Sequence, residues 1–167
     1  MPPDRLSIEE ILSRLDSGPA RIASVTQGLS EAQLHTPPLA GEWSANDILA
    51  HLRSCQDVWG GYISRMVAED KPTLHIVSPR NYIRRTNYLE LDFAPSFKAF
   101  TGARADLMTL LKSLPAEAWL RSGIATGAGR PNDRSVHGQG DALARHERAH
   151  LRQIEAVVKA LTDAKPE

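Results

Sequence analysis

The sequence predicts an all-α protein built as a helical bundle, and three features support that prediction. Apolar residues recur at spacings of three and four in four long segments, which is the period of an amphipathic helix. Strict alternation of apolar and polar residues, which marks a half-buried strand, is almost absent. The chain has 167 residues, enough to bury a core without disulfides, and its single cysteine excludes an intramolecular disulfide. We therefore expect one domain, residues 1–167, whose four helices pack through their apolar stripes.

The first predicted helix is interrupted near its middle. Its apolar stripe stops before Pro19 and resumes after it. The residues of the stripe are Ile8, Ile11, Leu12, Leu15, Ile22, Val25 and Leu29. Because proline removes a backbone donor and clashes with the preceding turn, we expect this helix to be broken or kinked at Pro19. The second helix follows Ser44, which forms a predicted N-cap box with Asp47. Its stripe contains Ile48, Leu52, Cys55, Trp59, Tyr62 and Met66.

The third and fourth predicted helices follow two long irregular connections. The third helix ends before Pro115, and its stripe contains Phe93, Phe97, Phe100, Leu107, Leu111 and Leu114. The last helix runs from about Asp141 to Thr162, with Leu143, His146, His150, Ile154, Val157 and Leu161 on one stripe. The connections, residues 71–92 and 115–140, are long enough to cross the bundle or to cover an active site.

Two histidines stand in the last stripe where leucine or isoleucine is expected. His146 and His150 lie four residues apart, about 40° from each other around a helix, so both imidazoles face the core. His51 lies on or beside the stripe of the second helix. A lone buried histidine is most often a hydrogen-bonded core residue, but three that converge bury several ring nitrogens that need partners. A metal site explains these three better, and neutral imidazoles with an open position suit Zn²⁺ or Ni²⁺.

Residues 146–150 also match the H-E-x-x-H pattern of zinc proteases. That class needs a third protein ligand after the motif, but the nearest acidic residue, Glu155, lies about 140° around the helix from His150 and faces away. We therefore expect the third ligand upstream, at His51, which is not the protease arrangement. Glu147 is a candidate base or a support for the metal ligands, and a solvated face of glutamate and arginine is the alternative.

Charge and hydropathy exclude several classes of function. Lys and Arg number 20, Asp and Glu number 20, and the two signs are interspersed. A duplex-DNA binder needs a basic surface, and a membrane-surface protein needs a polybasic patch, so we expect neither partner. No run of about 18 apolar residues is present, and the N-terminal segment lacks the apolar region of a signal peptide. These features favour a cytoplasmic protein that acts on a small molecule.

Two segments resemble the signatures of the DinB/YfiT-like superfamily of metal-dependent enzymes, GEWSANDILAHL at 41–52 and ARHERAHLRQIEAV at 144–157. YLELDFAPSFKAF at 88–100 and LLKSLPAEAWLRSG at 110–123 are similar to segments of a subgroup, so the resemblance covers nearly the whole chain. It implies an up-down-down-up four-helix bundle with a metal on three histidines. Those positions fall on His51, from W-S-x-x-D-x-x-x-H, and on His146 and His150, from H-x-x-x-H.

The resemblance also implies a chemistry. Better-studied relatives are transferases or isomerases that use low-molecular-weight thiols such as mycothiol or bacillithiol, which a metal, often zinc, activates as the thiolate. Many members are homodimers, and many have no known reaction. Two hypotheses therefore stay open. The first is a metal-dependent thiol S-transferase or hydrolase, in which the ion lowers the pKa of a bound thiol or water. The second is a metal-free bundle that binds a small molecule or a partner without catalysis.

Other polar and aromatic residues receive simpler predictions. In the 71–92 connection, side chains that could line the site and hold an anionic substrate are Tyr82, Arg84, Arg85 and Tyr88, and a mobile solvated loop is the alternative. Cys55 is expected to pack as a small apolar residue, with an auxiliary ligand or redox thiol as the alternative. Trp43 is expected to pack the turn before Ser44 against the bundle, and Trp59 and Trp119 to lie in the core or at a dimer interface. No site is assigned to His35, His75 or His137.

Overall fold

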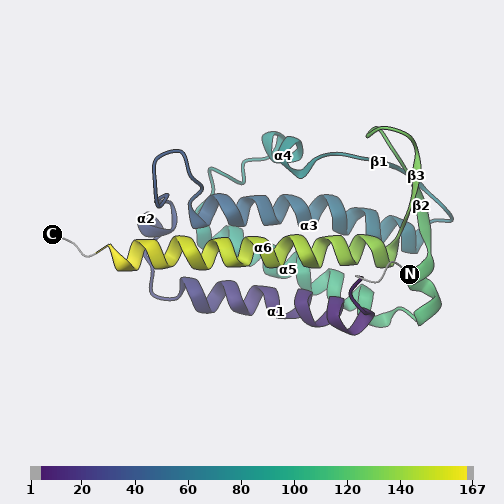
Figure 1. The fold of residues 1–167 in the computed structure, drawn as a ribbon, viewed down its shortest axis with the longest axis horizontal. Coiled ribbons are helices and arrows are strands. Elements are labelled where there is room, and N and C mark those ends of the chain that lie inside the picture. The colour runs from purple at the N-terminus through teal and green to yellow at the C-terminus, as the bar shows by residue number, and fades with distance from the viewer. Residues whose placement is uncertain (1–4, 165–167) are drawn as a thin grey trace.

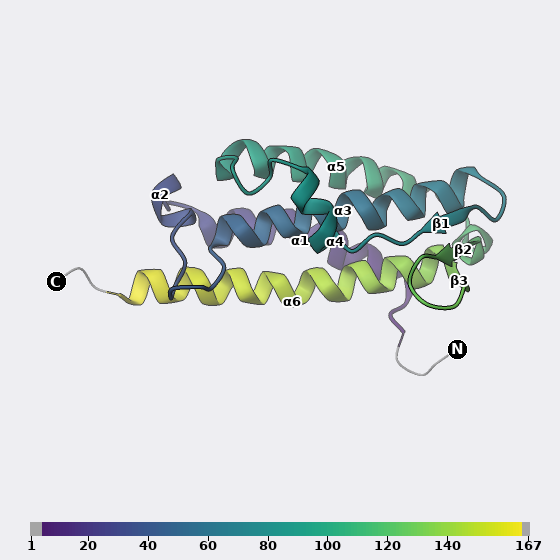
Figure 2. The ribbon, with the colours of Figure 1, turned by 90° about the horizontal axis from the view of Figure 1, so that it is seen from above.

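The computed structural model describes residues 5–164, and within them four long helices form the bundle. They are α1 (Ile8–Thr26), α3 (Ala45–Ala68), α5 (Phe93–Ser113) and α6 (Val136–Asp163). In Figure 1, α1 and α6 run in one direction and α3 and α5 in the other, which is the predicted up-down-down-up order. Helix α6 packs on α1 and α3, and α5 packs on the same two helices from the other side (Figure 2).

Short elements occupy the connections between the long helices. They are α2 (Glu31–Leu34), β1 (Thr73–His75), α4 (Pro79–Tyr82), η1 (Ile83–Arg85), η2 (Ala116–Leu120), β2 (Ser122–Thr126) and β3 (Asn132–Ser135), where η marks a 3₁₀ helix. Strand β2 pairs in parallel with β1 and antiparallel with β3 at one end of the bundle (Figure 1). The sequence predicted no strand here, because strands of three to five residues are too short to show a period.

Helix α1 runs through Pro19 without the predicted break. Pro19 has no N–H to donate to the carbonyl of Leu15, one helical turn earlier. The guanidinium of Arg104 on α5 supplies the missing donor, with Nη1 2.8 Å from the Leu15 oxygen. The expected break was therefore wrong, because a side chain distant in sequence replaces the lost backbone bond, and the alternative of a kink at Pro19 stays a prediction.

Helix α6 begins five residues earlier than predicted, at Val136. Ser135 caps it, accepting a hydrogen bond from the Gly138 N–H at 3.0 Å. The glycines near the start of α6 made this segment look like a loop in the sequence. Gly140 is instead a position where the helix packs closely against neighbouring side chains. A β-carbon there would lie 3.3 Å from Ile11 Cγ2 and 3.5 Å from the Trp119 ring.

The N-terminus of α3 confirms the predicted cap. The Ser44 hydroxyl oxygen accepts a hydrogen bond from the Asp47 N–H at 3.1 Å, and the Asp47 carboxylate accepts one from the Ser44 N–H at 2.9 Å. This box fixes where α3 starts and therefore the rotation of its buried face, which includes His51.

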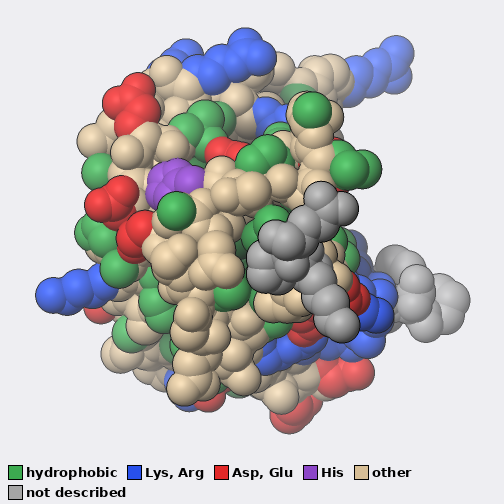
Figure 3. Space-filling model, turned by 90° about the vertical axis from the view of Figure 1, so that its left-hand side faces the viewer, with side chains coloured by type: hydrophobic (Ala, Val, Ile, Leu, Met, Phe, Trp, Pro, Cys, Tyr) green, Lys and Arg blue, Asp and Glu red, His purple; other side chains and the backbone are tan. Residues whose placement is uncertain are grey.

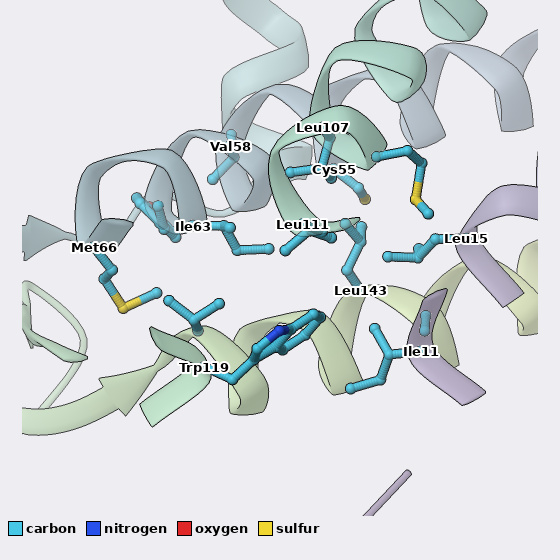
Figure 4. Close-up of a cluster of buried hydrophobic side chains, with 14 of the residues drawn as sticks. Ile11, Leu15, Cys55, Val58, Ile63, Met66, Leu107, Leu111, Trp119 and Leu143 are labelled. Carbon is cyan, nitrogen blue, oxygen red and sulfur yellow. The ribbon is translucent and has the colours of Figure 1, made fainter. Parts of the chain in front are cut away.

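The surface carries interspersed charges over an apolar interior. The face shown in Figure 3 carries both acidic and basic side chains, and neither sign covers most of it. Inside, apolar side chains of all four long helices meet Trp119 of η2, which is 2% exposed (Figure 4). Within residues 5–164, none of the helices has the length and hydropathy needed to cross a membrane.

Candidate metal centre

The structure brings together the three histidines on which the sequence analysis placed the metal. His51 comes from α3, and His146 and His150 come from consecutive turns of the antiparallel neighbour α6. His146 Nε2 lies 3.0 Å from His51 Nε2 and 3.1 Å from His150 Nε2. Two nitrogen ligands of a tetrahedral Zn²⁺ lie about 3.3 Å apart, given Zn–N bonds of about 2.05 Å. The separations of His146 Nε2 from the other two Nε2 atoms are therefore close to those between ligands of one divalent ion.

The protonation of these rings also suits metal binding. Burial is the largest cause that lowers the pKa of His51 and of His146, each to about 4, and the neighbouring histidines and Arg80 lower both further. Burial likewise lowers the pKa of His150, against a hydrogen bond to Gln153 that raises it. At neutral pH the rings are uncharged, so each keeps a nitrogen lone pair for a cation.

Gln153 orients the outermost ring. Its side-chain oxygen lies 2.8 Å from His150 Nδ1, and an amide oxygen can only accept a hydrogen bond. The ring proton of His150 is therefore on Nδ1, and the lone pair of Nε2 points toward His146. A polar group that fixes the tautomer of a histidine in this way is characteristic of metal ligands.

Cys55 adjoins the histidines from the interior. Its Sγ lies 3.5 Å from His51 Nε2, and with His51 and His146 it forms a group whose donor atoms all lie within 4.8 Å of one another. The side chain is also fully buried among apolar residues such as Leu107 (Figure 4). Burial, and then the charge of Glu147, raise the pKa of the thiol to about 12, which favours the neutral, apolar form.

Aromatic rings and one arginine border the centre on its outer side. The Trp43 ring centroid lies 5.3 Å from that of His51 and 6.1 Å from that of His150, so Trp43 flanks the site as well as the turn before α3. Trp59 meets His146 edge-to-face at 4.9 Å. The guanidinium of Arg80, on α4, lies 5.6 Å from the Trp43 ring centroid.

Two cavities open beside these residues. A cavity of about 380 Å³ is lined by Trp43, Asp47, His51, Arg80, Ile83, Arg84 and Leu89. A larger groove of about 700 Å³ lies between the 35–44 connection and the C-terminal half of α6, and its lining includes His150 and Gln153. Because both linings include Trp43 and Arg80, these two side chains lie between the cavity and the groove.

The predicted substrate-binding residues are only partly in place. Arg84 lines the smaller cavity, whereas Arg85, Tyr82 and Tyr88 belong to neither lining. Tyr88 instead donates a hydrogen bond to Asp57 at 2.6 Å and stacks under Arg53. Arg80 was not predicted, since the 71–92 connection has no period to show which side chains face the site, and Trp43 was assigned only to the turn before Ser44.

Comparisons with known proteins agree with this architecture. The family model of the DinB superfamily matches residues 14–154, which include all three histidines. The chain belongs to the DinB superfamily. A solved structure with the same fold is that of YfiT from Bacillus subtilis, described as a probable metal-dependent hydrolase with an unusual four-helix bundle topology. It covers 97% of this chain and 93% of its own, with a TM-score of 0.80 and 14% identity. A search of curated proteins gave no match.

In this DinB-superfamily chain, Glu147 is buried, so the interpretation that it belongs to a solvated face of glutamate and arginine is wrong. It is 2% exposed and forms a two-pronged ion pair with Arg104 of α5, one prong at 2.8 Å. Arg104 also donates to Gln56 at 2.9 Å. The carboxylate fits against Gly18, where a β-carbon would lie 2.0 Å from Glu147 Oε1. Glu147 thus connects α6 to α1 and α5 instead of facing the two cavities.

The remaining acidic and histidine predictions have clear outcomes. Glu155 faces away from the histidines, as expected, and pairs with Arg21 of α1 at 2.5 Å. His137 was placed in a connection, but it lies in the first turn of α6, buried against Trp119 at 6.3 Å between ring centroids. His35 and His75 lie outside the site, on the C-cap of α2 and on β1.

Proposed function

We propose that this protein is a metal-dependent enzyme acting on a small molecule, with a divalent ion held by His51, His146 and His150. The observation that supports it is that Nε2 of His146 lies 3.0 Å from Nε2 of His51 and 3.1 Å from Nε2 of His150, beside a cavity that His51 lines. Three imidazoles with an open position suit Zn²⁺ or Ni²⁺. When bound, such an ion lowers the pKa of a thiol or water, which supplies a nucleophile at neutral pH.

The chain's own residues would arrange the rest of the reaction. Trp43 and Trp59 flank the histidine rings of His51 and His146. Gln153 holds His150 in the tautomer that presents its lone pair. We assign the reaction to thiol S-transfer or to hydrolysis, with a low-molecular-weight thiol as co-substrate in the first case. The description of YfiT as a probable metal-dependent hydrolase supports the hydrolytic form.

Elemental analysis of the purified full-length protein tests the metal site. We expect a divalent ion in the wild type and its loss in His51→Ala and His150→Ala. His75→Ala, on β1, is the matched control and keeps the metal. Unchanged metal content in the His51 and His150 variants would show that the assignment is wrong.

A metal-free binding bundle is the second candidate, and the same distances favour it in one respect. Separations of 3.0 and 3.1 Å are also hydrogen-bond lengths, so a protonated His146 Nε2 can donate to His51 Nε2 or to His150 Nε2 without an ion. A ligand that binds only the folded state raises Tm. Equal Tm values for metal-supplied and chelated protein would favour this second candidate.

A further inference from the structure

Arg80 occupies the junction between the cavity beside His51 and the groove along α6. It lines both, and its guanidinium lies near the Trp43 ring. Among residues 5–164 it has no carboxylate within ion-pair distance and no hydrogen-bond partner, unlike Arg104, Arg65 and Arg121. A guanidinium with several free donors beside an aromatic wall is suited to a planar anion.

The charges around this junction favour an anion over a cation. Arg84 is a second cation in the smaller cavity. The carboxylate of Asp47 in the same lining already accepts hydrogen bonds from the Ser44 N–H and hydroxyl, at 2.9 and 2.8 Å. Glu42, the other carboxylate, belongs to the lining of the groove. A divalent ion on the histidines would add further positive charge.

Part of the groove beyond Arg80 is apolar, although Glu42 and Gln153 also belong to its lining. Small and apolar side chains of α6, Ala156, Val157 and Ala160, face Pro38 and Leu39 of the 35–44 connection. Leu39 is 67% exposed although it is a large apolar residue. An apolar stretch of wall next to the guanidinium of Arg80 suits a molecule with an anionic head and an apolar chain.

We propose that the substrate of this site is a carboxylate with an apolar chain, its head bound by Arg80 and its chain lying in the α6 groove. This inference rests on the proposed function, since it places the carboxylate beside the three histidines, and it adds the substrate class. Arg80 is then a specificity-determining residue, and the length of the groove sets the preferred chain length.

Calorimetric titration of the full-length protein with octanoate tests the head group. Octanamide has the same shape without charge, and octylammonium carries the opposite charge. We expect octanoate to bind at least about tenfold more tightly than octanamide, because it makes charge-assisted hydrogen bonds. Arg80→Met should abolish that difference, and Arg85→Met, from the same segment but outside both linings, should keep it.

A second pair of variants tests the chain. We expect affinity to rise at least about tenfold from butyrate to octanoate in the wild type, because four more methylenes are buried. Ala156→Phe, which fills the groove, should remove this rise, whereas Ala149→Phe, exposed on the same helix, should not.

Titrations before and after chelation separate this inference from the proposed function. Equal binding of octanoate and octanamide, no octanoate binding, or equal behaviour of Arg80→Met and Arg85→Met would overturn the inference while metal analysis still supports the enzyme. Octanoate discrimination that Arg80→Met abolishes, in a protein that contains no metal as purified and takes up none when it is supplied, would uphold the carboxylate site and refute the metal centre.

Discussion

At the scale of single residues, the Arg104–Glu147 pair stands out because it is buried in the centre of the bundle. Breaking a buried pair leaves an unpaired charge in the interior, which costs about 3–5 kcal/mol. We expect Glu147→Gln to lower the free energy of unfolding by roughly that amount, measured by urea denaturation. Arg104 would also lose part of the orientation that places it against the Leu15 carbonyl.

Helix α6 supplies its own control for this prediction. Glu155 also pairs with an arginine of a neighbouring helix, Arg21, but both side chains are more than 40% exposed. We expect Glu155→Gln to cost less than about 1 kcal/mol, as is typical of surface ion pairs. Equal losses in Glu147→Gln and Glu155→Gln would show that burial of the Arg104 pair contributes nothing to stability.

Cys55 allows a residue-scale test of how many ligands the centre has. Its thiol is kept neutral by burial, so we expect the three histidines to hold the ion without it. Cobalt-substituted protein should lack a thiolate-to-cobalt charge-transfer band, and Cys55→Ala should keep both metal content and spectrum. A band in the wild type that Cys55→Ala removes would instead make the sulfur a fourth ligand, as its 3.5 Å distance from His51 Nε2 permits.

At the scale of elements, features that depend on nearby residues could be predicted from the sequence, and features that depend on a distant residue could not. The apolar stripes, the Ser44 cap and the inward direction of His146 and His150 depend on residues three or four positions apart. The path of α1 through Pro19 depends instead on an arginine that is 85 positions away in the chain, on α5. No sequence pattern within α1 indicates that Arg104 is its partner.

The 71–92 connection shows the same limit, because α3 holds it in place through tyrosines. The Tyr62 hydroxyl donates to the His75 carbonyl at 3.0 Å and accepts from the Val77 N–H at 2.8 Å. This pair of bonds lies three residues before Arg80, so it positions α4 over the site. The sequence shows a tyrosine on an apolar stripe but gives no sign of which loop it binds.

Removing that anchor should loosen the segment that carries Arg80. In Tyr62→Phe the Val77 amide loses its acceptor, and we expect its hydrogen exchange to accelerate and stability to fall by about 1–3 kcal/mol. Tyr88→Phe, which releases Asp57 further along the connection, should leave the Val77 amide protected. Unchanged exchange at Val77 in Tyr62→Phe would remove Tyr62 from this role.

At the scale of the whole molecule, the helix order is what assembles the centre. Because α3 and α6 run antiparallel side by side, a histidine on one meets a pair four residues apart on the other (Figure 2). The long 71–92 connection, which is required because α3 and α5 run in parallel, then brings α4 to the place where the 35–44 connection also lies. The homodimer implied by the resemblance stays a prediction, which sedimentation equilibrium measures.

The centre should also make the stability of the entire chelated protein depend on pH. Burial lowers the pKa of His51 and His146 to about 4 in the folded state, against about 6.5 when unfolded. Between these values the unfolded chain binds protons that the folded chain does not, so stability falls as pH falls from 6.5 to 4. We expect denaturation midpoints of the chelated protein to decline through this window, and less steeply in His51→Gln. The control is His35→Gln, an exposed position at the end of α2, which should follow the wild type. A wild-type denaturation midpoint that stays constant between pH 6.5 and 4 would contradict the prediction that the buried histidines are neutral.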